Sequence, residues 1–598
     1  MARNKFNIDE ELDVPFNWEQ MKRSFVYLGK YKKNIFLAFI YSSAAILLGL
    51  LSPMMQKYVI DTLIPQKNVT LIIVLGIAFF GLNILIVLAN RARGRISVRT
   101  GQGIVTDIRT DLFEHLQKLS FDYYDSRPHG KILTRVINYV NSVGDFLSNS
   151  LINAVLELLN MFFILGFMLA LSPKLTLVVL AGLPVFALYV FLTKPRQRRY
   201  QQLRSNKQSN VTAYLAENIN GIKVTQAFAR EDYNKGIFNS LLSEYRKYYM
   251  KAIYLVHGMW PMTATLQRIV HMAIYITGIY LFRAELINAE GVLQIGTLIA
   301  MTQYANRFWG PMQRLGNIYN QLTDTAAYLE RIFQVLDEPV TVDDKPGAKD
   351  LPPIEGRVTF RDVYFEYEKG TPVLRHVSFE AAPGESIALV GPTGAGKSTI
   401  INLLSRFYNV TEGAVLIDNH DISDVTLQSL RKQMGVMLQD TFIFSGNILE
   451  NIRYGRLDAT DEECIAAAKA VHADEFIRHM KDGYLTETNE RGEGLSAGQK
   501  QLISFARTLL SDPRILILDE ATSSIDTNTE RLVQEGIAAL LKGRTSFIVA
   551  HRLSTIKNCT RIMYIDNGQI AEQGSHDELM RKKGLYYKLY MSQIGNIA

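Results

Sequence analysis

The chain has 598 residues, of which 48% are hydrophobic and 21% are charged, and its formal net charge is +7. A chain of this length has room for two or more domains. Its mean hydropathy near zero hides an uneven distribution, because the long apolar runs come before residue 320. Much of the basic excess lies beside those runs, where it would face anionic lipid, so we expect no nucleic-acid partner. The two cysteines, Cys464 and Cys559, imply no disulfide framework.

The N-terminal 33 residues do not resemble a secretory signal. They begin with an acidic run, Asp9 to Asp13, instead of a basic lead into an apolar core. Residues 15–33 then mix apolar and basic side chains, which predicts an interfacial amphipathic helix before the first apolar run. These side chains are Phe16, Trp18, Met21, Phe25 and Leu28 with Lys22, Arg23, Lys30 and Lys32.

Six apolar segments before residue 320 have the length of a membrane span, since a helix needs about 20 apolar residues to cross a hydrocarbon core about 30 Å thick. They are residues 34–55, 70–90, 148–171, 175–193, 257–282 and 294–316. Only Ser172-Pro173-Lys174 separates the third from the fourth, which predicts a tight hairpin. We expect a six-span membrane domain, and buried helices of a large soluble domain are the alternative.

Lysine and arginine concentrate in two of the stretches between these segments, which predicts the orientation. The stretch after the second segment carries Arg91, Arg93, Arg95, Arg99 and Arg109, and the one after the fourth carries Lys194, Arg196, Arg198, Arg199, Arg204 and Lys207. The opposite loops carry only Lys57, Lys67, Lys174 and Arg283. We therefore expect both termini and the second half of the chain in the cytoplasm.

Both basic stretches are too long for simple connections. Residues 91–147 and 194–256 contain few glycines, many charges and periodic apolar residues, which predicts helices that continue beyond the bilayer. Each stretch has one glycine-bearing corner, Arg127–Lys131 in the first and Asn218–Lys223 in the second, where the chain is expected to turn.

The second half contains two sequence motifs for nucleotide chemistry. Residues 391–399 follow the P-loop pattern G-x-x-x-x-G-K-[ST], whose backbone N–H groups cradle phosphates. Lys397 is expected to reach the β- and γ-phosphates, and Ser398 to hold Mg²⁺. The apolar run Ile515–Leu518 leads into Asp519, suited to bind the metal, and Glu520, suited to act as the base for water. The chain is therefore expected to use ATP and Mg²⁺.

Further short motifs accompany the P-loop: Tyr364-Phe365-Glu366-Tyr367, Met437-Leu438-Gln439-Asp440, Leu495-Ser496-Ala497-Gly498-Gln499, Ser523-Ser524-Ile525-Asp526 and His551. The membrane half adds Phe121-Asp122 with Gly130 and Arg135, the stretch Glu217–Glu231, and Ala327–Asp337 around Glu330-Arg331-Ile332-Phe333. In this order the set resembles the ATP-binding cassette exporters over nearly the whole chain. The similarity is to bacterial multidrug-type half-transporters, in which one membrane domain precedes one nucleotide-binding domain.

The resemblance implies a role for each motif. Tyr367 would stack on adenine, Gln439 would sense Mg²⁺ and the helical stalk, and His551 would be the switch histidine. The catalytic set would be Glu520, His551 and Gln439, and the metal set Ser398, Gln439 and Asp519. The nucleotide-binding set would be Tyr367, Gly391, Pro392, Thr393, Gly394, Ala395, Gly396, Lys397, Ser398, Thr399, Ser496, Ala497, Gly498, Gln499 and Asp526. The membrane-half motifs would be two coupling regions and the junction into the cassette.

The resemblance also implies a dimer. In the family the signature loop of one cassette closes on ATP held by another, and this chain offers one P-loop and one signature. Ala497 stands where the family usually has Gly, which suits a subunit with a mildly altered signature in a heterodimer. Every other ATP-site residue is in place, which equally permits a homodimer.

Ionisable residues inside membrane segments are candidates for function. Glu157, Arg268, His271, Tyr304 and Arg307 are the candidate cavity residues, with Glu157 paired to an arginine as the alternative to substrate contact. Aromatic side chains suited to a hydrophobic or amphiphilic solute accompany them, namely Tyr275, Tyr304, Phe308 and Trp309. A drug, a lipid and a peptide all stay open as cargo.

The prediction is an α-helical transmembrane domain followed by an α/β P-loop ATPase domain, in a bacterial cytoplasmic membrane. The expected bounds are 1–33 for the interfacial helix, 34–320 for the spans, 321–354 for a linker and 355–598 for the ATPase. The expected function is ATP-driven export. An ATP-gated channel or regulator on the same fold is the alternative. Cassette ATPases that act on DNA or ribosomes lack fused spans, and importers usually keep spans and cassette on separate chains.

Overall fold

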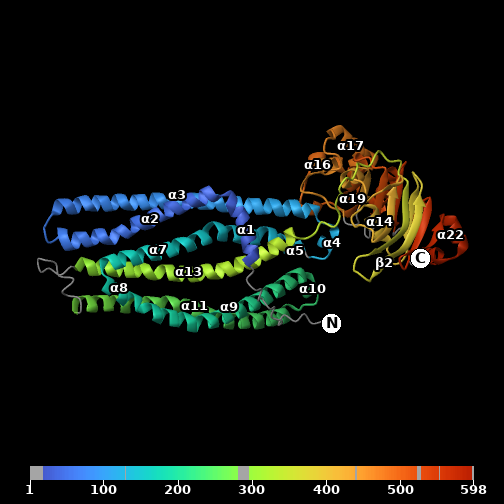
Figure 1. Ribbon diagram of the computed structural model, residues 1–598. Coiled ribbons are helices and arrows are strands. Elements are labelled where there is room, and N and C mark those ends of the chain that lie inside the picture. Colours follow the sequence, from blue (N-terminus) through green and yellow to red (C-terminus); the bar gives the residue numbers. More distant parts are fainter. Residues whose placement is uncertain are drawn as a thin grey trace. The chain divides into compact units, whose positions relative to one another are not determined.

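The computed structural model describes residues 18–127, 129–280, 295–437, 441–520, 527–550 and 553–595. The chain divides into two compact units, Met1–Leu116 with His129–Asp337, and Gln117–Pro128 with Glu338–Ala598. The first unit consists of long helices, and the second combines sheets with shorter helices (Figure 1). The segment Gln117–Pro128 belongs to the second unit although both of its neighbours in sequence belong to the first.

The described residues of the first unit are helical almost throughout. Its helices are α1 (Trp18–Lys30), α2 (Lys32–Tyr58), α3 (Val69–Lys118), α5 (His129–Thr134), α6 (Val140–Asp145), α7 (Leu151–Leu171), α8 (Pro173–Leu180), α9 (Gly182–Asn220), α10 (Ile222–Ala227), α11 (Glu231–Tyr280) and α13 (Ile295–Leu336). Short π-helical turns over Val59–Leu63, Arg135–Tyr139 and Phe146–Ser150 continue α2 and connect α5, α6 and α7.

Four stretches of the described chain are helices long and apolar enough to cross a bilayer: Lys32–Leu63, Val69–Lys118, Ile132–Leu171 and Pro173–Asn220. They contain the first four predicted segments. The fifth and sixth fall in α11 and α13, where Arg268, His271 and Arg307 make the helices less apolar. Residues 281–294 lie outside the described part, so the count of six spans stays a prediction.

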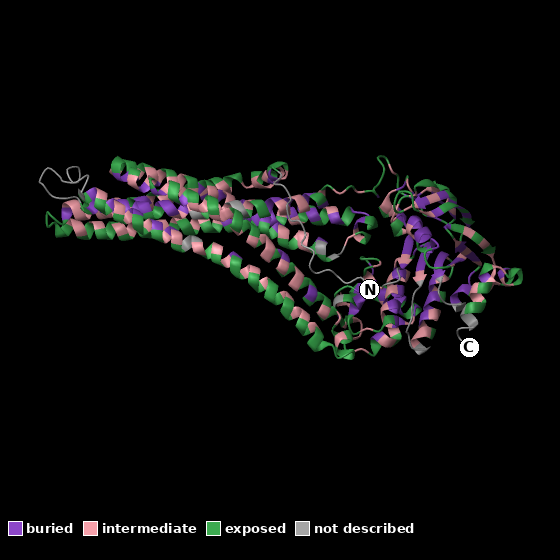
Figure 2. Cartoon of the chain, turned by 90° about the horizontal axis from the view of Figure 1, so that it is seen from below, coloured by how far each residue is buried: buried purple, intermediate pink, exposed green. Residues whose placement is uncertain are grey.

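The apolar stretch of α3 has no buried residues. Ile77, Phe80 and Val87 are between 64% and 69% exposed. An apolar surface of this length is unfavourable in water and favourable in contact with lipid chains. The backbone N–H and C=O groups of the helix need no water, because they form hydrogen bonds within the helix. Figure 2 shows exposed residues along the long helices and buried residues gathered in the sheets of the second unit. The first unit is therefore a multi-pass membrane domain.

The turns between helices follow the local chemistry of the sequence. Ser172 adopts an extended conformation and caps α8, because its Oγ accepts from the Leu175 N–H at 3.4 Å. Pro173 occupies the first turn of α8, and the tight turn between α7 and α8 confirms the predicted hairpin. Gly221 ends α9 at the predicted second corner. The first corner begins earlier than predicted, since α3 ends at Lys118 and Gly130 already lies in α5.

Helix α13 forms the centre of the bundle, in contact with α2, α7 and α11. Phe308 and Trp309 are at most 2% exposed, and Tyr304 is fully buried. The Tyr304 hydroxyl donates to the Leu50 carbonyl at 2.6 Å, and its ring stacks on Phe167. The expectation that these three aromatic side chains form a surface for solute is therefore wrong in this chain, because they pack in the apolar core.

The amphipathic character of the N-terminal segment is seen in α1. Its buried residues, Met21 and Ser24, lie on the side that packs against α13. Arg23 forms an ion pair with Asp337 at 2.6 Å, and its guanidinium lies over the Phe333 ring. The hydrogen bond from Arg23 is the main reason why the pKa of Asp337 falls below its ordinary value. Tyr27 donates to Asp111 of α3 at 2.7 Å. This helix thus contacts protein through Met21 and Ser24, while Trp18 is 52% exposed, and its predicted contact with the membrane surface stays a prediction.

The boundary between the units differs from the expected linker. Helix α13 continues to Leu336, and the first unit ends at Asp337. Residues 321–336 are therefore part of the helical unit, and only the stretch from Glu338 to the first strand connects it to the ATPase. The predicted junction motif lies at the end of α13, where Leu329, Ile332 and Phe333 are buried.

The described residues of the second unit form three sheets. An antiparallel sheet has the order β2 (Pro372–Ala381), β1 (Val358–Glu366), β4 (Glu412–Ile417), β5 (His420–Asp421). The main sheet has the order β12 (Gln569–Gly574), β11 (Arg561–Asp566), β3 (Ser386–Val390), β10 (Thr545–Ala550), β9 (Ile515–Glu520), β6 (Met434–Met437). The third pairs β7 (Gly446–Asn447) with β8 (Glu487–Thr488).

The described helices of this unit connect and cover the sheets. They are α4 (Phe121–Asp125), α14 (Lys397–Leu404), α15 (Leu427–Lys432), α16 (Ile448–Arg453), α17 (Asp461–Ala470), α18 (Ala473–Arg478), α19 (Ala497–Leu510), α20 (Thr527–Leu541), α21 (Leu553–Lys557), α22 (His576–Lys582) and α23 (Leu585–Gly595). Side chains of a strand alternate between its two faces. Ile515 and Ile517 of β9 accordingly pack in one core with the antiparallel sheet, while Leu516 and Leu518 pack in a second core with the helices.

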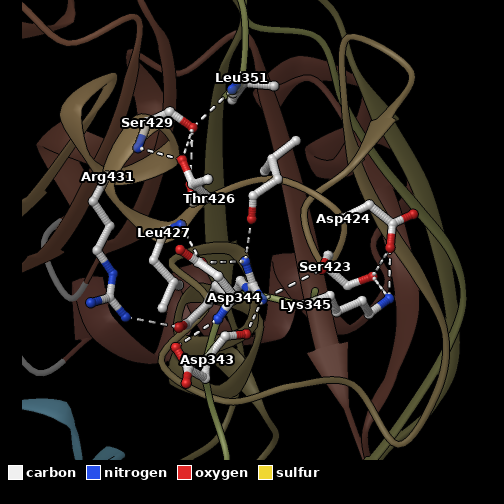
Figure 3. Close-up of polar contacts among 12 residues, drawn as sticks. Asp343, Asp344, Lys345, Leu351, Ser423, Asp424, Thr426, Leu427, Ser429 and Arg431 are labelled. Atoms are coloured by element: carbon white, nitrogen blue, oxygen red, sulfur yellow. Dashed lines mark hydrogen bonds and ion pairs between the residues drawn. The ribbon is translucent and has the colours of Figure 1, made fainter. Parts of the chain in front are cut away.

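The connection after Glu338 is fastened to the ATPase unit by polar contacts (Figure 3). Lys345 pairs with Asp424 at 2.6 Å, and Asp344 accepts from the Leu427 N–H at 2.7 Å, which caps α15. Arg406 is buried and donates to the carbonyls of Val425 and Asp343 at 2.7 and 2.8 Å. The linker therefore lies against the unit along its length.

Candidate functional site

The predicted ATP-site residues follow strands that end at one edge of the main sheet. Strands β3, β10, β9 and β6 are neighbours and all parallel. The P-loop follows β3, the two acidic residues end β9, and His551 and Gln439 come directly after β10 and β6 in sequence. Ligands of open parallel sheets bind outside the carboxyl ends of the strands. The topology therefore brings the ends of the four strands that precede or carry these motifs to a common edge.

The P-loop has a conformation that only glycine adopts without strain. Gly391, Gly394 and Gly396 have φ angles of 141°, 81° and 104°. A Cβ on Gly391 would lie 2.1 Å from the Ile565 carbonyl oxygen, so a side chain there would require the neighbouring strand to move. Helix α14 begins at Lys397, and its free N-terminal N–H groups and dipole make this position favourable for an anion.

Lys397 lies within the loop and is 8% exposed. Its ammonium donates to the carbonyls of Gly391 and Pro392 at 3.0 and 2.7 Å. Burial lowers the pKa of Lys397, and the negative charge of Asp519 opposes this effect. Lys397 and Asp519 are thus near each other across the sheet edge, and Ser398 is exposed at the start of α14.

These residues fit a magnesium ion bound to nucleotide phosphates. Mg²⁺ prefers hard oxygen ligands and usually takes one or two protein groups beside phosphates and waters. The Ser398 hydroxyl and the Asp519 carboxylate are oxygen ligands at the phosphate end of the loop. No group of three or more His, Cys, Asp or Glu side chains that could hold a metal by itself occurs among the described residues.

Several predicted residues lie beyond what the structure describes. Gln439, Asp526 and His551 fall outside the described residues, and for Glu520 only the backbone is described. In the described strands, Ala550 of β10 pairs with Glu520 of β9, and Met437 of β6 pairs with Leu518 of β9. The roles assigned to Gln439, Asp526, His551 and Glu520 stay predictions.

Tyr367 lies beside the P-loop helix, as a residue stacking on adenine would. Its hydroxyl donates to Thr399 Oγ1 at 3.3 Å and accepts from Asn402 Nδ2 at the same distance. The ring is 42% exposed, which leaves part of its surface open. Phe365 and Tyr408 make edge contacts with it, at centroid distances of 4.8 and 5.1 Å. The aromatic motif and the P-loop therefore meet in space.

The signature loop forms the start of a helix. Ser496 caps α19, with its Oγ accepting from the Gln499 N–H at 3.2 Å and Gln499 Oε1 accepting from the Ser496 N–H at 2.9 Å. Ser496 and Ala497 are exposed, and Gly498 is buried. In the described part of the chain, no hydrogen bond joins this loop to the P-loop. The exposed N–H groups and helix dipole suit a phosphate that comes from outside this unit.

Tyr408, which the sequence analysis did not single out, connects the adenine side of the site to α4. Its ring contacts Tyr367, and its hydroxyl donates to Asp125 Oδ2 of α4 at 2.8 Å. Burial, and then this hydrogen bond, raise the pKa of Tyr408, so the hydroxyl keeps its proton. Tyr408 follows α14 by four residues, and its contact with Tyr367 depends on how β1 and this segment pack, which no local sequence pattern predicts.

The predicted first coupling region is divided between the units. Phe121 and Asp122 belong to α4, and the Phe121 ring lies 4.4 Å from that of Phe407. Arg127 pairs with Glu338 at 3.2 Å, and Thr341 donates to Ser120 at 2.9 Å. These contacts fasten α4 to both the ATPase unit and the linker. Gly130 and Arg135 lie in the helical unit.

The second coupling region, residues 217–231, lies in the helical unit around α10. Its apolar side chains are open, with Phe228 73% and Val224 61% exposed. Tyr214 of α9 donates to the Asn234 carbonyl of α11 at 3.2 Å, which holds the ends of the two long helices together.

The candidate cavity residues do not form one cluster in this chain. Glu157 of α7 pairs with Arg314 of α13, at 2.5 Å from Nε and 2.8 Å from Nη2. Arg307 donates to the Gly49 carbonyl at 2.5 Å, and Arg268 is exposed. Nε2 of His271 is buried with no hydrogen-bond partner among the described residues. The structure thus gives Glu157 an arginine partner, and that partner was missed from the sequence.

Comparison with known proteins covers both units. Residues 35–312 match the family described as ABC transporter transmembrane region, and residues 374–523 match the family described as ABC transporter. The chain is 42% identical over 596 residues to the uncharacterized ABC transporter ATP-binding protein YknV of Bacillus subtilis, covering 99% of this chain and 98% of the relative. It is 39% identical over 580 residues to the putative multidrug export ATP-binding/permease protein YgaD of the same organism, covering 96% and 99%.

A relative from Mycobacterium bovis, named fatty acid ABC transporter ATP-binding/permease protein, is 38% identical over 502 residues, covering 83% of this chain and 78% of the relative. Among solved structures, that of a bacterial Atm1-family ABC exporter with ATP bound matches with a TM-score of 0.76 and 29% identity, covering 95% of this chain and 98% of that one. The fold, the motifs and these relatives agree. The chain belongs to the ATP-binding cassette exporters, with a helical membrane domain fused to an ATPase domain that drives export.

Proposed function

We propose that two copies of this chain, or this chain and a second half-transporter, export an amphiphilic solute by alternating access. The exposed signature helix carries this proposal. The exposed Ala497 begins α19 with an N–H group that has no hydrogen-bond partner among the described residues, while the P-loop of the same chain is built to hold phosphates from one side only. A complete ATP site therefore combines the P-loop of one chain with the signature of another.

Binding of ATP would use the residues at the sheet edge. The N–H groups of residues 391–396 and of the start of α14 would hold the phosphates, and Lys397 would exchange its carbonyl partners for phosphate oxygens. Tyr367 would stack on the base. Ser398, Asp519 and Gln439 would hold Mg²⁺, which neutralises phosphate charge when bound. Glu520 would take the proton of the attacking water, and His551 would position the γ-phosphate end of the site.

Movement of the cassette would reach the membrane through α4. This helix is fastened to the ATPase unit by Tyr408, Phe407 and Glu338, and it connects α3 to α5 in sequence. Closing and opening of two cassettes around ATP would move these long helices between inward-facing and outward-facing arrangements. We infer from the basic stretches that the cassettes lie in the cytoplasm, and the bacterial relatives support a bacterial cytoplasmic membrane for the spans.

The solute class is proposed from two observations. The membrane helices combine exposed apolar surface with intramembrane arginines, as an amphiphile requires. Relatives named for multidrug export and for fatty acids are similar to this chain over most of its length.

Transport in proteoliposomes tests the proposal. With the cassettes outside, ATP and Mg²⁺ should drive a fluorescent amphiphile into the vesicles, and Glu520→Gln should abolish the accumulation. Accumulation that is equal in the two proteins would contradict ATP-driven export. An ion current gated by ATP without net movement of any amphiphile would instead support the channel.

A further inference from the structure

A polar cavity of about 180 Å³ lies between α2, α3 and α7 in the membrane domain. Its polar lining residues are Ser42, Asn90, Arg93, Asn153, Glu157 and Asn160, and Ala45, Ile46 and Leu156 complete it. We name it the α2–α3–α7 cavity. One water needs roughly 10–15 Å³ of such space, so the cavity has room for a small polar group together with water. Polar and charged side chains are costly within a membrane, and they mark functional positions there.

The protein satisfies only part of this lining. Arg93 uses Nη2 to donate to Asn153 Oδ1 at 2.6 Å, and its other donors have no hydrogen-bond partner among the described residues. The amides of Asn90 and Asn160 likewise have none in the described part of the chain. The Asn153 amide nitrogen also has no acceptor among the residues that the structure describes. Four side chains from two helices thus direct hydrogen-bond donors at a shared space.

The charges around the cavity do not cancel. Glu157 is neutralised by Arg314, which binds both of its oxygens. Within the described ranges, Arg93 has only the neutral amide of Asn153 as a hydrogen-bond partner. Arg93 lies in the basic stretch just after the second predicted span, and its positive charge has no carboxylate partner among the described residues. An anion with one charge would restore the balance.

The chain beside the cavity is suited to an acyl tail. One turn before Asn90 on the same side of α3, Ile86 is half-buried, and its neighbour Val87 is 64% exposed. We propose that the α2–α3–α7 cavity binds the head group of a singly charged anionic amphiphile, with Arg93 as the counter-charge and the three asparagine amides as donors. This inference rests on the proposed export of an amphiphile and specifies its head group.

Amphiphiles that share one chain and differ in head group test the inference. Purified protein in phosphatidylcholine nanodiscs would be titrated at about pH 9 with dodecanoic acid, so that its carboxyl group is ionised although the bilayer surface raises the pKa of a carboxyl group. Dodecanol and dodecyltrimethylammonium would be titrated in parallel, and empty nanodiscs would give the partition background. The acid should bind at least about tenfold more tightly than the alcohol or the cation. Equal affinities in the wild-type protein would overturn the inference without the need for any variant.

Substitutions at Arg93 locate the effect. Arg93→Gln should lower the affinity for dodecanoic acid to that for dodecanol, and Arg93→Lys should keep most of it. Arg95→Gln is the matched control, because Arg95 is exposed and lies about 200° around the same helix. Equal loss in the Arg93→Gln and Arg95→Gln proteins would show general membrane electrostatics and overturn the site.

A second lipid composition identifies the source of the head group. If phosphatidylglycerol in the nanodisc removes the Arg93-dependent binding of dodecanoic acid, the ligand is an anionic lipid of the bilayer. If the binding persists, the ligand is a free amphiphile.

A transport assay distinguishes failure of this inference from failure of the proposed function. ATP-driven movement of a cationic or neutral amphiphile, with no preference for the acid, overturns the head-group class alone. Arg93-dependent binding of the acid without ATP-driven movement of any amphiphile overturns the proposed function.

Discussion

Glu520 ends β9, and its neighbour in register on β10 precedes His551. If Glu520 is the general base for water, Glu520→Gln should reduce ATP turnover by about 10²–10⁴-fold while ATP still binds, because the amide keeps the size of the side chain and cannot take a proton. Steady-state hydrolysis and nucleotide binding to the purified protein measure the two effects. Hydrolysis near the wild-type rate would assign the base elsewhere.

Tyr367 combines an exposed ring with a hydroxyl that contacts Thr399 and Asn402. Stacking of a base on an aromatic ring contributes about 1–3 kcal/mol. Tyr367→Ala should therefore weaken ATP binding about tenfold or more. Tyr367→Trp should retain the affinity for ATP, since it keeps an aromatic ring. Tyr367→Phe keeps the ring and removes the hydroxyl, so it measures what the hydroxyl contributes to ATP binding. Equal affinity of all four proteins for ATP in equilibrium binding would show that another aromatic residue stacks on adenine.

At the scale of elements, α4 is fastened to the ATPase unit by a ring contact and a charged hydrogen bond. Tyr408→Phe keeps the ring against Tyr367 and removes the hydrogen bond to Asp125, which contributes about 1 kcal/mol at this exposed position. Basal ATPase and ATP affinity should stay near wild type, and stimulation by a transported amphiphile should fall. Asp125→Asn in a double-mutant cycle measures the coupling. Additive effects of the two changes would exclude this hydrogen bond as the connection.

The linker depends on Arg406, whose guanidinium satisfies carbonyls from two separate segments. Arg406→Met would leave these carbonyls buried without a donor, at a cost of about 2–4 kcal/mol. The midpoint of thermal unfolding of the ATPase domain within the whole protein should fall by several degrees. Arg361→Met is the control, because Arg361 is exposed on β1. Equal midpoints for the two variants would mean that the linker is held by other contacts.

At the scale of the whole molecule, the open question is which chains form the ATP sites. Ala497 is exposed at the first turn of α19, so its methyl group lies beside the N–H groups that would approach a phosphate. If the chain needs a partner with the usual signature, Ala497→Gly should raise the ATPase activity of the chain alone by about tenfold. A tenfold change corresponds to a free-energy difference of roughly 1.4 kcal/mol. Mass measurement and ATPase assays on the chain purified alone test this. A stable, active dimer with little gain from the substitution would exclude an obligatory partner.

Much of the chemistry could be predicted because it is carried by contiguous residues. The nine residues 391–399 contain their own turn, glycines and helix start, and the observed φ angles follow from those local requirements. Hydropathy along the chain predicted the membrane helices for the same reason, namely that the signal is local. Each span forms its backbone hydrogen bonds within its own segment. The capping pair Ser496 and Gln499 is another local feature.

The sequence by itself thus determined the ATP chemistry, the membrane helices and the order of the domains. Only the tertiary structure decided that Arg314 pairs with Glu157, 157 positions away, and that Tyr408 binds Asp125, 283 positions away. It also buried Tyr304, Phe308 and Trp309, which the sequence suggested as surface for solute. The reason is that periodicity predicts which residues form a helix, whereas the partners of each face depend on how separate helices pack, and that packing is set by long-range contacts throughout the domain.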